Sequence, residues 1–279
     1  MNDVNKDRYA VFGNPIKHSR SPDIHQQFAE QLKQTMTYQR QLVALGEFEV
    51  SARTFFDSKG AGLNITVPFK LDAYQFADQL SERARRAGAV NTLINKDGII
   101  VGDNTDGCGL LADLQSNLQW PIGEANILVL GAGGAVRGIL EPLLLANPAS
   151  IVIANRTLEK AEQLSCAFQP LANDAGCQLS AKQYDELIEP FDIIINGTSA
   201  SLSGDTLPLA NECFNGACCY DMMYAKGPTP FLQLAAKQGA RKIADGLGML
   251  VEQAAESFRL WRNVKPSTRV VIQSIRNSL

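Results

Sequence analysis

A glycine-rich turn between an apolar run and a helix-like run is the part of the sequence whose spacing most directly suggests chemistry. Residues 127–130 are branched and apolar, Gly131, Gly133 and Gly134 follow, and a helix-like run continues from Ala135. Such glycines let the backbone approach a diphosphate closely, and the amides that begin the following helix point toward the anion with the positive end of the helix dipole. The pattern predicts a diphosphate site.

The end of the next predicted strand indicates which dinucleotide this turn would serve. About 20 residues after the first glycine of a dinucleotide-binding fold, a second strand usually ends in an acidic residue that binds the adenosine ribose. Here the strand at 150–154 is followed by Asn155, Arg156 and Thr157 instead. A guanidinium suits a 2′-phosphate, whereas a carboxylate would repel it. The sequence therefore favours NADP over NAD.

The same residues allow a simpler interpretation. Val136 stands where the third glycine or alanine of the usual pattern belongs, so the pattern by itself is weak. The glycines could form an ordinary strand-to-helix turn, and Arg156 could be a solvated residue at a helix start. The order of strand, turn, helix and second strand favours the nucleotide site.

Length and composition limit the class of protein. The chain has 279 residues, 45% hydrophobic and 20% charged, with a formal net charge of -3, which is typical of a globular protein with two lobes. No basic excess suggests nucleic acid, and neither a signal peptide nor a membrane span is predicted, because the N-terminus is polar and long apolar runs are missing. We expect a cytoplasmic protein, without disulfides or a metal site because the six cysteines show no C-x-x-C pair and there are only two histidines.

The first part of the chain alternates between short strands, polar loops and helices. We expect strands at 8–13, 37–45, 62–67, 89–95 and 98–102, and helices at 22–34, at 47–58 and from Pro68 onward. Ser21 precedes Pro22 and is expected to cap the first helix. Lys70 falls in the first turn of the third helix, just past a strand end.

From Gly107 onward, strands and helices alternate more regularly. A helix at 107–118 leads into strands at 126–130, 150–154, 178–181, 191–196, 217–220 and 241–244, with helices at 134–146, 157–168 and 230–238 between them. This alternation predicts a parallel sheet covered by helices on both faces.

Two further helices, at about 246–261 and 267–277, follow the last predicted strand. We expect them to return to the first lobe. On the earlier helix, helical spacing places Gly246, Met249 and Gln253 on a flank free to face a site, away from the apolar packing face. The expected fold class is two-lobed α/β, with an N-terminal α/β domain of residues 1–106 and 246–279 and a Rossmann-type, doubly wound NADP-binding domain of residues 107–245.

Eight segments taken in order resemble the shikimate dehydrogenase family, from Gly13 to Gln253. They are GNPIKHSRSP (13–22), NITVPFK (64–70), AGAVNT (87–92), GDNTDG (102–107), GAGGA (131–135), NRT (155–157), YDMMY (220–224) and DGLGMLVEQA (245–254). The resemblance implies an enzyme that interconverts shikimate and 3-dehydroshikimate with NADP, mostly in the reductive direction, in the aromatic amino-acid (chorismate) pathway. It also implies that the first lobe binds the substrate.

The resemblance assigns roles to residues of the first lobe. It implies that Ser19 and Ser21 bind the substrate carboxylate, that Thr66, Asn91 and Gln253 contact ring hydroxyls, and that Lys70 and Asp106, which also touch the substrate, form the catalytic pair. Such a pair suits the reaction, because a hydride that reaches a carbonyl carbon leaves an alkoxide that needs a proton. Outside these motifs Lys70 would be read as a surface lysine and Asp106 as a helix cap.

The resemblance also extends the cofactor site. It implies that Gly131, Gly133, Gly134 and Ala135 bind the diphosphate, that Asn155, Arg156 and Thr157 bind the 2′-phosphate, that Thr198, Ser199 and Met222 line the nicotinamide side, and that Tyr224 and Gly246 lie where the lobes meet. Met222 could equally be a core residue.

Two other functions stay open. One is a quinate/shikimate dehydrogenase with relaxed use of NAD and NADP, which we would expect to carry an acidic residue close after the second strand. The other is a non-catalytic NADPH-binding regulator on the same fold, which we would expect to lack Lys70 or Asp106. The expected partner is a small-molecule substrate, and the chain is expected to be a monomer or homodimer. The segment KGPTPF (226–231) receives no chemical role.

Overall fold

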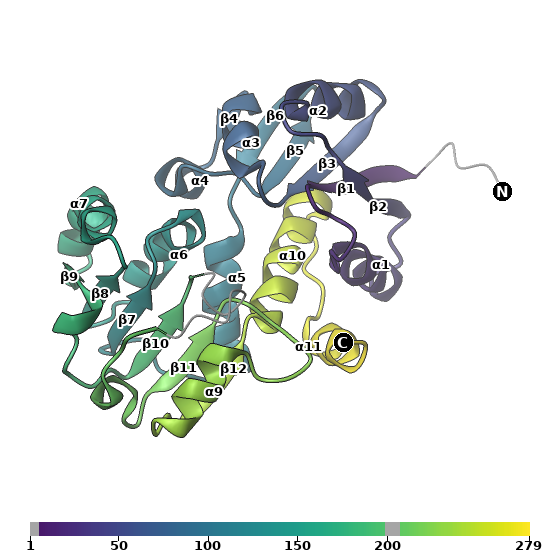
Figure 1. Ribbon diagram of the computed structural model, residues 1–279. Helices are drawn as coiled ribbons and strands as arrows, with labels where there is room; N and C mark the ends of the chain where they lie inside the picture. Colours follow the sequence, from purple (N-terminus) through teal and green to yellow (C-terminus); the bar gives the residue numbers. More distant parts are fainter. Residues whose placement is uncertain (1–5, 199–206) are drawn as a thin grey trace. The chain divides into compact units, whose positions relative to one another are not determined.

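The structure, a computed structural model, describes residues 6–198 and 207–279 (Figure 1). Ser199, one of the predicted cofactor residues, lies outside the described residues. The chain divides into two compact units, one of residues Met1–Gly109 with Val251–Ser278 and one of Leu110–Leu250 with Leu279. The limits expected from the sequence, at 106/107 and 245/246, fall a few residues earlier.

The sheet of the first unit mixes parallel and antiparallel strands in the order β2-β1-β3-β5-β6-β4. Its strands are β1 (Asp7–Gly13), β2 (Met36–Leu42), β3 (Gly60–Ile65), β4 (Gln79–Leu80), β5 (Thr92–Lys96) and β6 (Ile99–Asp103). β1 pairs in parallel with β2 and β3, whereas β5 runs antiparallel to β3 and β6. The sequence did not predict β4, because two residues are too few to show strand alternation.

Helices pack on both faces of this sheet. They are α1 (Ser21–Gln31), α2 (Phe48–Asp57), α3 (Lys70–Phe76), α4 (Glu82–Ala87), α10 (Leu247–Arg262) and α11 (Arg269–Asn277). On one face, Phe12 and Leu63 of the sheet are buried with Phe48 and Phe55 of α2. The short helix α4 is a further element that the sequence did not predict.

The C-terminal helices pack against the first unit, as the sequence predicted. Trp261 of α10 lies against Tyr9 of β1 with ring centroids 4.6 Å apart. Its indole Nε1 donates to the carbonyl of Leu93 at 3.1 Å. At the end of α11, the carbonyl of Ser278 accepts a hydrogen bond from Arg20 at 3.0 Å.

The second unit is a doubly wound parallel sheet. Its strands are β7 (Asn126–Leu130), β8 (Ser150–Ala154), β9 (Gln178–Lys182), β10 (Ile193–Asn196), β11 (Cys218–Asp221) and β12 (Lys242–Asp245). They lie in the order β12-β11-β10-β7-β8-β9, and each neighbouring pair is parallel. This is the strand order of a dinucleotide-binding Rossmann fold, so the predicted fold class is confirmed.

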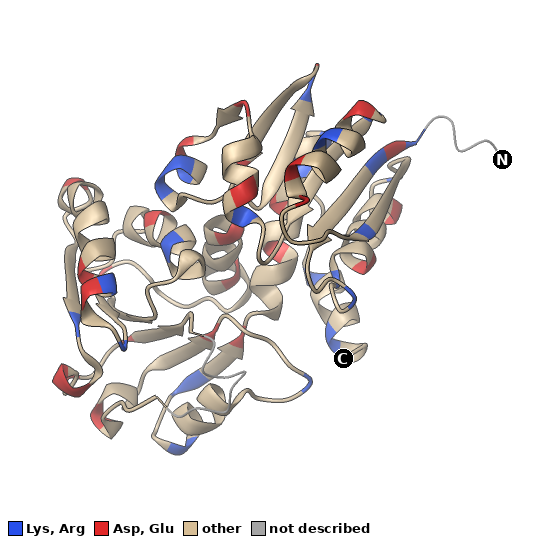
Figure 2. Ribbon diagram, turned by 45° about the horizontal axis from the view of Figure 1, so that its top comes forward, with Lys and Arg blue, Asp and Glu red and all other residues tan. Residues whose placement is uncertain are grey.

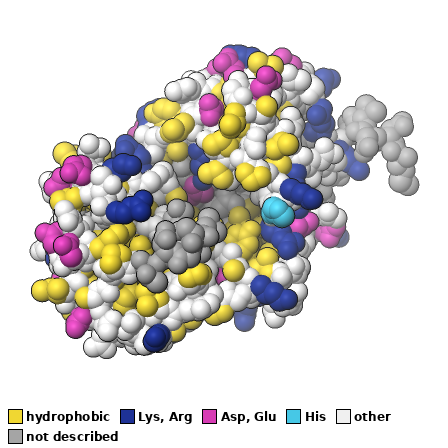
Figure 3. Space-filling view, viewed as in Figure 1, with side chains coloured by type: hydrophobic (Ala, Val, Ile, Leu, Met, Phe, Trp, Pro, Cys, Tyr) yellow, Lys and Arg dark blue, Asp and Glu magenta, His cyan; other side chains and the backbone are white. Residues whose placement is uncertain are grey.

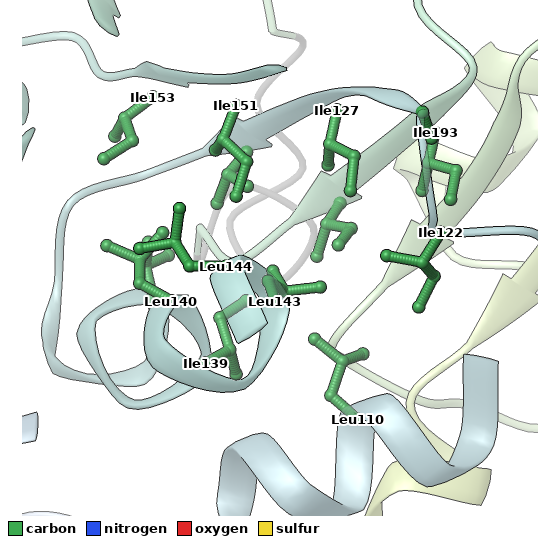
Figure 4. Close-up of a cluster of buried hydrophobic side chains, with 14 of the residues drawn as sticks. Leu110, Ile122, Ile127, Ile139, Leu140, Leu143, Leu144, Ile151, Ile153 and Ile193 are labelled. Atoms are coloured by element: carbon green, nitrogen blue, oxygen red, sulfur yellow. The ribbon is translucent and has the colours of Figure 1, made fainter. Parts of the chain in front are cut away.

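Two hydrophobic cores cover the two faces of this sheet. Side chains of α5 (Asp106–Ala112) and α6 (Gly134–Leu145) pack with Ile127, Ile151 and Ile193 on one face (Figure 4). Side chains of α7 (Leu158–Asp174) belong to the same core. α9 (Pro230–Lys237) packs on the other face, together with the 3-10 turns Tyr184–Glu186 and Asn211–Phe214. α7 extends past the predicted end at residue 168, with Pro170 inside it. The helix predicted at 107–118 is divided into α5 and a π-helical turn, Asp113–Asn117.

The surface carries mixed charges. Figure 2 shows Lys and Arg interspersed with Asp and Glu on helices of both units. Figure 3 shows hydrophobic side chains in separate groups on one face. The large hydrophobic residues with the highest exposed fractions in the described ranges are Ile188, Leu45 and Val270, at 73%, 72% and 68%. Within residues 6–198 and 207–279, no helix is both long and apolar enough to cross a bilayer.

The contact between β3 and α10 leads to a stability prediction. A Cβ on Gly62 would overlap the indole of Trp261, 2.7 Å from Cε2. We expect Gly62→Ala to cost about 1–3 kcal/mol, which corresponds to a thermal midpoint lowered by roughly 2–4 °C per kcal/mol. Gly123→Ala is the matched control, because its Cβ would meet its nearest atom at 4.0 Å. Equal midpoints for both variants in thermal unfolding would contradict this packing.

Candidate active site

Lys70 and Asp106 form an ion pair in the first unit. Lys70 begins α3 just after the loop that leaves β3, and Asp106 begins α5 just after the loop that leaves β6. Lys70 Nζ lies 2.5 Å from Asp106 Oδ2, with the side chains 29% and 13% exposed. The two residues that the sequence predicted as a pair are therefore in direct contact, and the lysine keeps access to solvent.

Asn91 holds the second oxygen of that carboxylate. Its Nδ2 donates to Asp106 Oδ1 at 2.8 Å and to Thr105 Oγ1 at 3.0 Å. Its Oδ1 accepts from the backbone amide of Thr105 at 2.9 Å. Asp106 is thus engaged on one oxygen by Lys70 and on the other by Asn91, and it is the first residue of its helix rather than a residue preceding it.

Gln253 brings α10 to the same group of side chains. Its Oε1 accepts from Thr105 Oγ1 at 3.3 Å and from Asn91 Nδ2 at 3.4 Å. Met249, expected on the same free flank of the helix, is instead 8% exposed in the core of the second unit. That expectation is wrong for Met249, because α10 passes from one unit to the other and its flank meets different neighbours along its length.

Ser19 and Ser21 form a small hydrogen-bonded turn at the start of α1. The Ser19 hydroxyl lies 3.2 Å from the Ser21 hydroxyl and accepts from the Ser21 amide at 3.3 Å. Arg40 Nε donates to the carbonyl of Ser19 at 2.7 Å. The expectation that Ser21 caps the helix is wrong: Arg20 is the cap residue, Ser21 already belongs to α1, and its amide is satisfied by Ser19.

Thr66 directly follows β3 and lies close to Gly13, which ends β1 just before the loop that carries Ser19. Its amide donates to the carbonyl of Phe12 at 2.9 Å. A Cβ on Gly13 would lie 2.5 Å from Thr66 Cγ2. Glycine at position 13 thus leaves room for the threonine side chain, which is partly exposed.

A group of polar residues centred on Asn64, which the sequence did not predict, lies next to Asn91. Tyr38 donates to Asn64 Oδ1 at 2.7 Å, and Asn64 Nδ2 donates to Ser257 at 3.0 Å and to Thr92 at 3.2 Å. Asn64 Nδ2 also donates to the carbonyl of Asn91 at 3.3 Å, so this group reaches Asn91. Asn64 belongs to the NITVPFK segment, which was the one signal in the sequence that could have identified it.

A salt bridge supports the loop that carries Asp106. Arg83 of α4 donates to both oxygens of Asp103, at 2.6 and 2.9 Å. Asp103 also accepts from Ser81 at 2.6 Å and from the amide of Asn104 at 2.7 Å. Burial lowers the pKa of the Arg83 guanidinium, but the bonds to Asp103 outweigh it and raise that pKa overall.

His25 is fully buried beside Asn64 and Tyr38, in neutral form. Its Nε2 lies 3.1 Å from Asn64 Oδ1, and its ring stacks on Tyr38 with centroids 4.2 Å apart. Burial lowers the pKa of His25 from 6.5 to about 3, against the smaller opposing effect of the bond to Asn64. The imidazole therefore acts as a structural hydrogen-bonding group.

This pKa shift predicts an acid-dependent loss of stability. Below pH 6.5 the unfolded chain binds a proton at His25, whereas the folded chain binds it only near pH 3. Protonation therefore favours unfolding as the pH falls, by at most about 1.4 kcal/mol per pH unit. In urea unfolding between pH 7 and pH 4, we expect His25→Gln to lose less stability than the wild type. The exposed His18→Gln is the control, and parallel curves for all three proteins would contradict the assignment.

In the second unit, the predicted glycine turn is open to solvent. Gly131 follows β7 with φ of +104°, and its amide donates to the carbonyl of Ala154 at 2.7 Å. Gly133 caps α6 without a side-chain hydrogen bond, and a Cβ on Gly133 or Gly134 would meet nothing within 4 Å. Ala135 is exposed as well. The amides of the first turn of α6 thus have room for a diphosphate, so the residues fit the predicted dinucleotide.

Val136 stands where the dinucleotide pattern has glycine or alanine, and its packing against Gly197 explains why valine fits there. Val136 is fully buried, and a Cβ on Gly197 would overlap its Cγ2 atom. The close approach that the third glycine of the pattern usually allows between helix and sheet is here provided by Gly197, after β10. The sequence pattern could not indicate that Gly197 takes this role, because Val136 and Gly197 are far apart in the chain.

Arg156 is exposed just beyond β8. Asn155 Nδ2 donates to the carbonyl of Thr157 at 2.8 Å, which closes the turn before α7. Within the part of the chain that the structure describes, Arg156 forms no ion pair with an acidic side chain. Its guanidinium is therefore available for an anionic ligand.

The other predicted cofactor residues follow the carboxyl ends of neighbouring strands. A Cβ on Gly131 would lie 3.2 Å from Thr198 Cγ2, so Thr198 adjoins the glycine turn. Met222 is partly buried against the core, and its amide donates to the carbonyl of Asn196 at 2.9 Å. A Cβ on Gly246 would lie 2.7 Å from the carbonyl carbon of Met222, so only glycine fits there. Tyr224 is half-buried.

Metal chemistry has no candidate among these residues. In the described ranges, no three His, Cys, Asp or Glu side chains are grouped in a way that could hold an ion. The groups that can do chemistry are an ion pair of lysine and aspartate in the first unit and an anion-binding turn with a nearby arginine in the second.

Three family models match consecutive parts of the chain. They are the shikimate dehydrogenase substrate binding domain at residues 11–93, shikimate / quinate 5-dehydrogenase at 113–204, and the shikimate 5'-dehydrogenase C-terminal domain at 246–276. Together they cover most of the chain, including the ion pair's lysine, the glycine turn and Gln253.

Whole proteins are similar along nearly the full length. A shikimate dehydrogenase (NADP(+)) from Cellvibrio japonicus is 55% identical over 276 residues, which are 98% of each chain. The crystal structure of an Ael1 enzyme from Pseudomonas putida has a TM-score of 0.91 at 47% identity, covering 96% of this chain and 98% of that one. Shikimate 5-dehydrogenase from Thermus thermophilus, in complex with NADP(H) and shikimate, has a TM-score of 0.86 at 31% identity, covering 98% and 100%. The prediction from the motifs is confirmed, and the chain belongs to the shikimate dehydrogenase family.

Proposed function

We propose that this chain interconverts 3-dehydroshikimate and shikimate with NADPH and NADP, in the biosynthesis of aromatic amino acids. Family membership supports the reaction and the cofactor. The observation that carries the proposal within this structure is the contact between Lys70 Nζ and Asp106 Oδ2 at 2.5 Å. A non-catalytic regulator on the same fold would have no need of this pair.

Lys70 is the proton donor in the reductive direction. Bound NADPH supplies the hydride that reaches the carbonyl carbon of 3-dehydroshikimate. The carbonyl oxygen, which gains the electron pair of the broken π bond, takes a proton from the Lys70 ammonium and becomes the hydroxyl of shikimate. Asp106 orients that ammonium through Oδ2 while Asn91 holds Oδ1. In the oxidative direction the neutral amine accepts the hydroxyl proton.

The remaining polar side chains of the first unit orient the substrate. Ser19 and Ser21 are proposed to bind the substrate carboxylate with hydroxyls that already face each other at 3.2 Å. Thr66, Asn91 and Gln253 are proposed to bind ring hydroxyls. Support for this role comes from the hydrogen bonds that join Asn91 and Gln253 to Asp106 and Thr105, because they hold donors and acceptors around the catalytic pair.

The second unit binds the dinucleotide. Gly131, Gly133, Gly134 and Ala135 hold the diphosphate, and Asn155, Arg156 and Thr157 hold the 2′-phosphate. Thr198 and Met222 are proposed to line the nicotinamide side, with Tyr224 and Gly246 nearby. A cytoplasmic location and a monomeric or homodimeric state stay predictions from the sequence.

The first experiment is an assay of NADPH absorbance with shikimate and NADP, alongside quinate and NAD. Reduction with shikimate and NADP alone is the expected result. Comparable rates with quinate or NAD would instead indicate the broader quinate/shikimate class. Binding of NADPH without reduction in any combination would indicate a regulator.

Removing the Lys70 amine tests the catalytic assignment. We expect Lys70→Ala to lower kcat by about 100-fold or more, because it removes the general acid. The dissociation constant for NADPH, measured by fluorescence titration, should stay close to that of the wild type, since Lys70 lies in the first unit and the glycine turn in the second. Lys96→Ala, which removes an exposed lysine of the same unit, is the control. Normal turnover in Lys70→Ala would refute the assignment.

Removing the Arg156 guanidinium tests the cofactor preference. A charge-assisted bond to a phosphate is worth about 1.5–3 kcal/mol, so Arg156→Ala should weaken NADP binding about tenfold or more. Binding of NAD, which lacks the 2′-phosphate, should change little. Lys237→Ala removes the same charge elsewhere in the second unit and should affect neither cofactor. An equal loss for NADP and NAD in Arg156→Ala would exclude the 2′-phosphate role.

A further inference from the structure

The segment that separates β11 from α9 is closed at its base by one buried hydrogen bond. Asp221 ends β11 and is fully buried, and Thr229 precedes α9 and is 4% exposed. Thr229 Oγ1 donates to Asp221 Oδ2 at 2.5 Å and accepts from the amide of Leu232 at 3.3 Å. One hydroxyl therefore caps α9 and ties the end of the loop, residues 222–228, back to its beginning. We call this segment the clasped loop.

The other oxygen of Asp221 connects the clasped loop to Asn196 at the end of the neighbouring strand β10. Asp221 Oδ1 accepts from Asn196 Nδ2 at 3.2 Å and from the amide of Met223 at 3.1 Å. Asn196 Oδ1 in turn accepts from the Thr198 hydroxyl at 2.7 Å and from the Thr198 amide at 3.1 Å. The chain of bonds from Thr229 thus ends at Thr198, which adjoins Gly131 of the glycine turn.

The far side of the clasped loop is held by the end of β12. The amide of Gly246 donates to the carbonyl of Met223 at 3.0 Å. Asn196, Asp221 and Asp245 occupy the same register at the carboxyl ends of three adjacent parallel strands. Ligands of open parallel sheets bind at this edge, so the clasped loop begins where the dinucleotide is expected.

We propose that Asp221 and Thr229 are positioning residues for the nicotinamide end of NADP. The bond between them sets the course of the clasped loop, which carries Met222 and Tyr224, and through Asn196 it also sets the place of Thr198. The proposal gives the segment KGPTPF a role, because its threonine closes the loop. It rests on the proposed dehydrogenase function and concerns only the nicotinamide end of the cofactor. The 2′-phosphate at the adenine end is assigned to Arg156, which takes no part in these hydrogen bonds.

The test compares two ligands that share the adenine end. NADPH carries the nicotinamide, whereas adenosine 2′,5′-bisphosphate carries the 2′-phosphate without it. In calorimetric titrations, we expect Thr229→Val to weaken NADPH binding about tenfold and to leave the bisphosphate within about twofold of the wild type. We also expect kcat to fall more than the KM for shikimate rises, because a displaced nicotinamide affects the chemical step.

Two further variants separate positioning from folding. Thr229→Ser keeps the hydroxyl that both caps α9 and bonds Asp221, so it should restore NADPH affinity and kcat. Asp221→Asn leaves the Thr229 cap of α9 in place and should reproduce the selective loss of NADPH affinity; it replaces Thr229→Val in the comparison if that variant does not fold. Equal weakening of both ligands, or unchanged NADPH affinity and kcat in Thr229→Val and Asp221→Asn, would overturn the proposal. A wild type that binds both ligands but does not oxidise shikimate would refute the dehydrogenase function. The comparison of the two binding constants would still test the positioning role, because it does not depend on turnover.

Discussion

A partly buried carboxylate needs a partner for each oxygen, and this requirement organises the first unit around Asp106, whose side chain is 13% exposed. Lys70 neutralises one oxygen, Asn91 donates to the other, and Asn104 accepts from the amide. Lys70 and Asn91 come from two segments outside the 104–106 loop, so the carboxylate joins three segments of the first unit. The same ion pair suits the reduction of a ketone, because Asp106 holds the Lys70 ammonium, the proton donor, in a fixed direction. Structure and chemistry are therefore served by one ion pair.

The second unit depends on a different constraint, the common direction of its strands. Parallel strands place all their carboxyl ends at one edge, and the amides of a following helix face that edge. Gly131, Asn196 and Asp221 follow or end neighbouring strands in this way. At this edge the strands no longer pair, so polar groups there either hydrogen-bond one another or stay accessible to an anion. The turn at Gly133 is open, whereas Asn196 and Asp221 are joined by a hydrogen bond.

Where the sequence misled, the cause was a contact that residue types and spacing do not show. Val136 departs from the dinucleotide pattern, but Gly197, which follows the adjacent strand β10, gives it room. Ser21 has the identity of a helix cap, yet Ser19 hydrogen-bonds it and the helix begins at Ser21 itself. Met249 has the spacing of a free flank, but the first residues of α10 belong to the second unit, where Met249 is buried in the core. Local propensity was a good guide to which elements form, and a weaker one to what their side chains touch.

By itself, the sequence determined the two-lobed α/β organisation, the parallel sheet, the glycine turn, the arginine in place of an acidic residue, and the family that the eight segments identify. It did so because apolar periodicity and glycine positions are local properties of the chain. Only the tertiary structure decided that Lys70 and Asp106 touch, that Tyr38 and His25 both contact Asn64, and that Thr229 closes a loop on Asp221. Hydrogen bonds between distant segments depend on strand order and register, which no local pattern in the chain expresses.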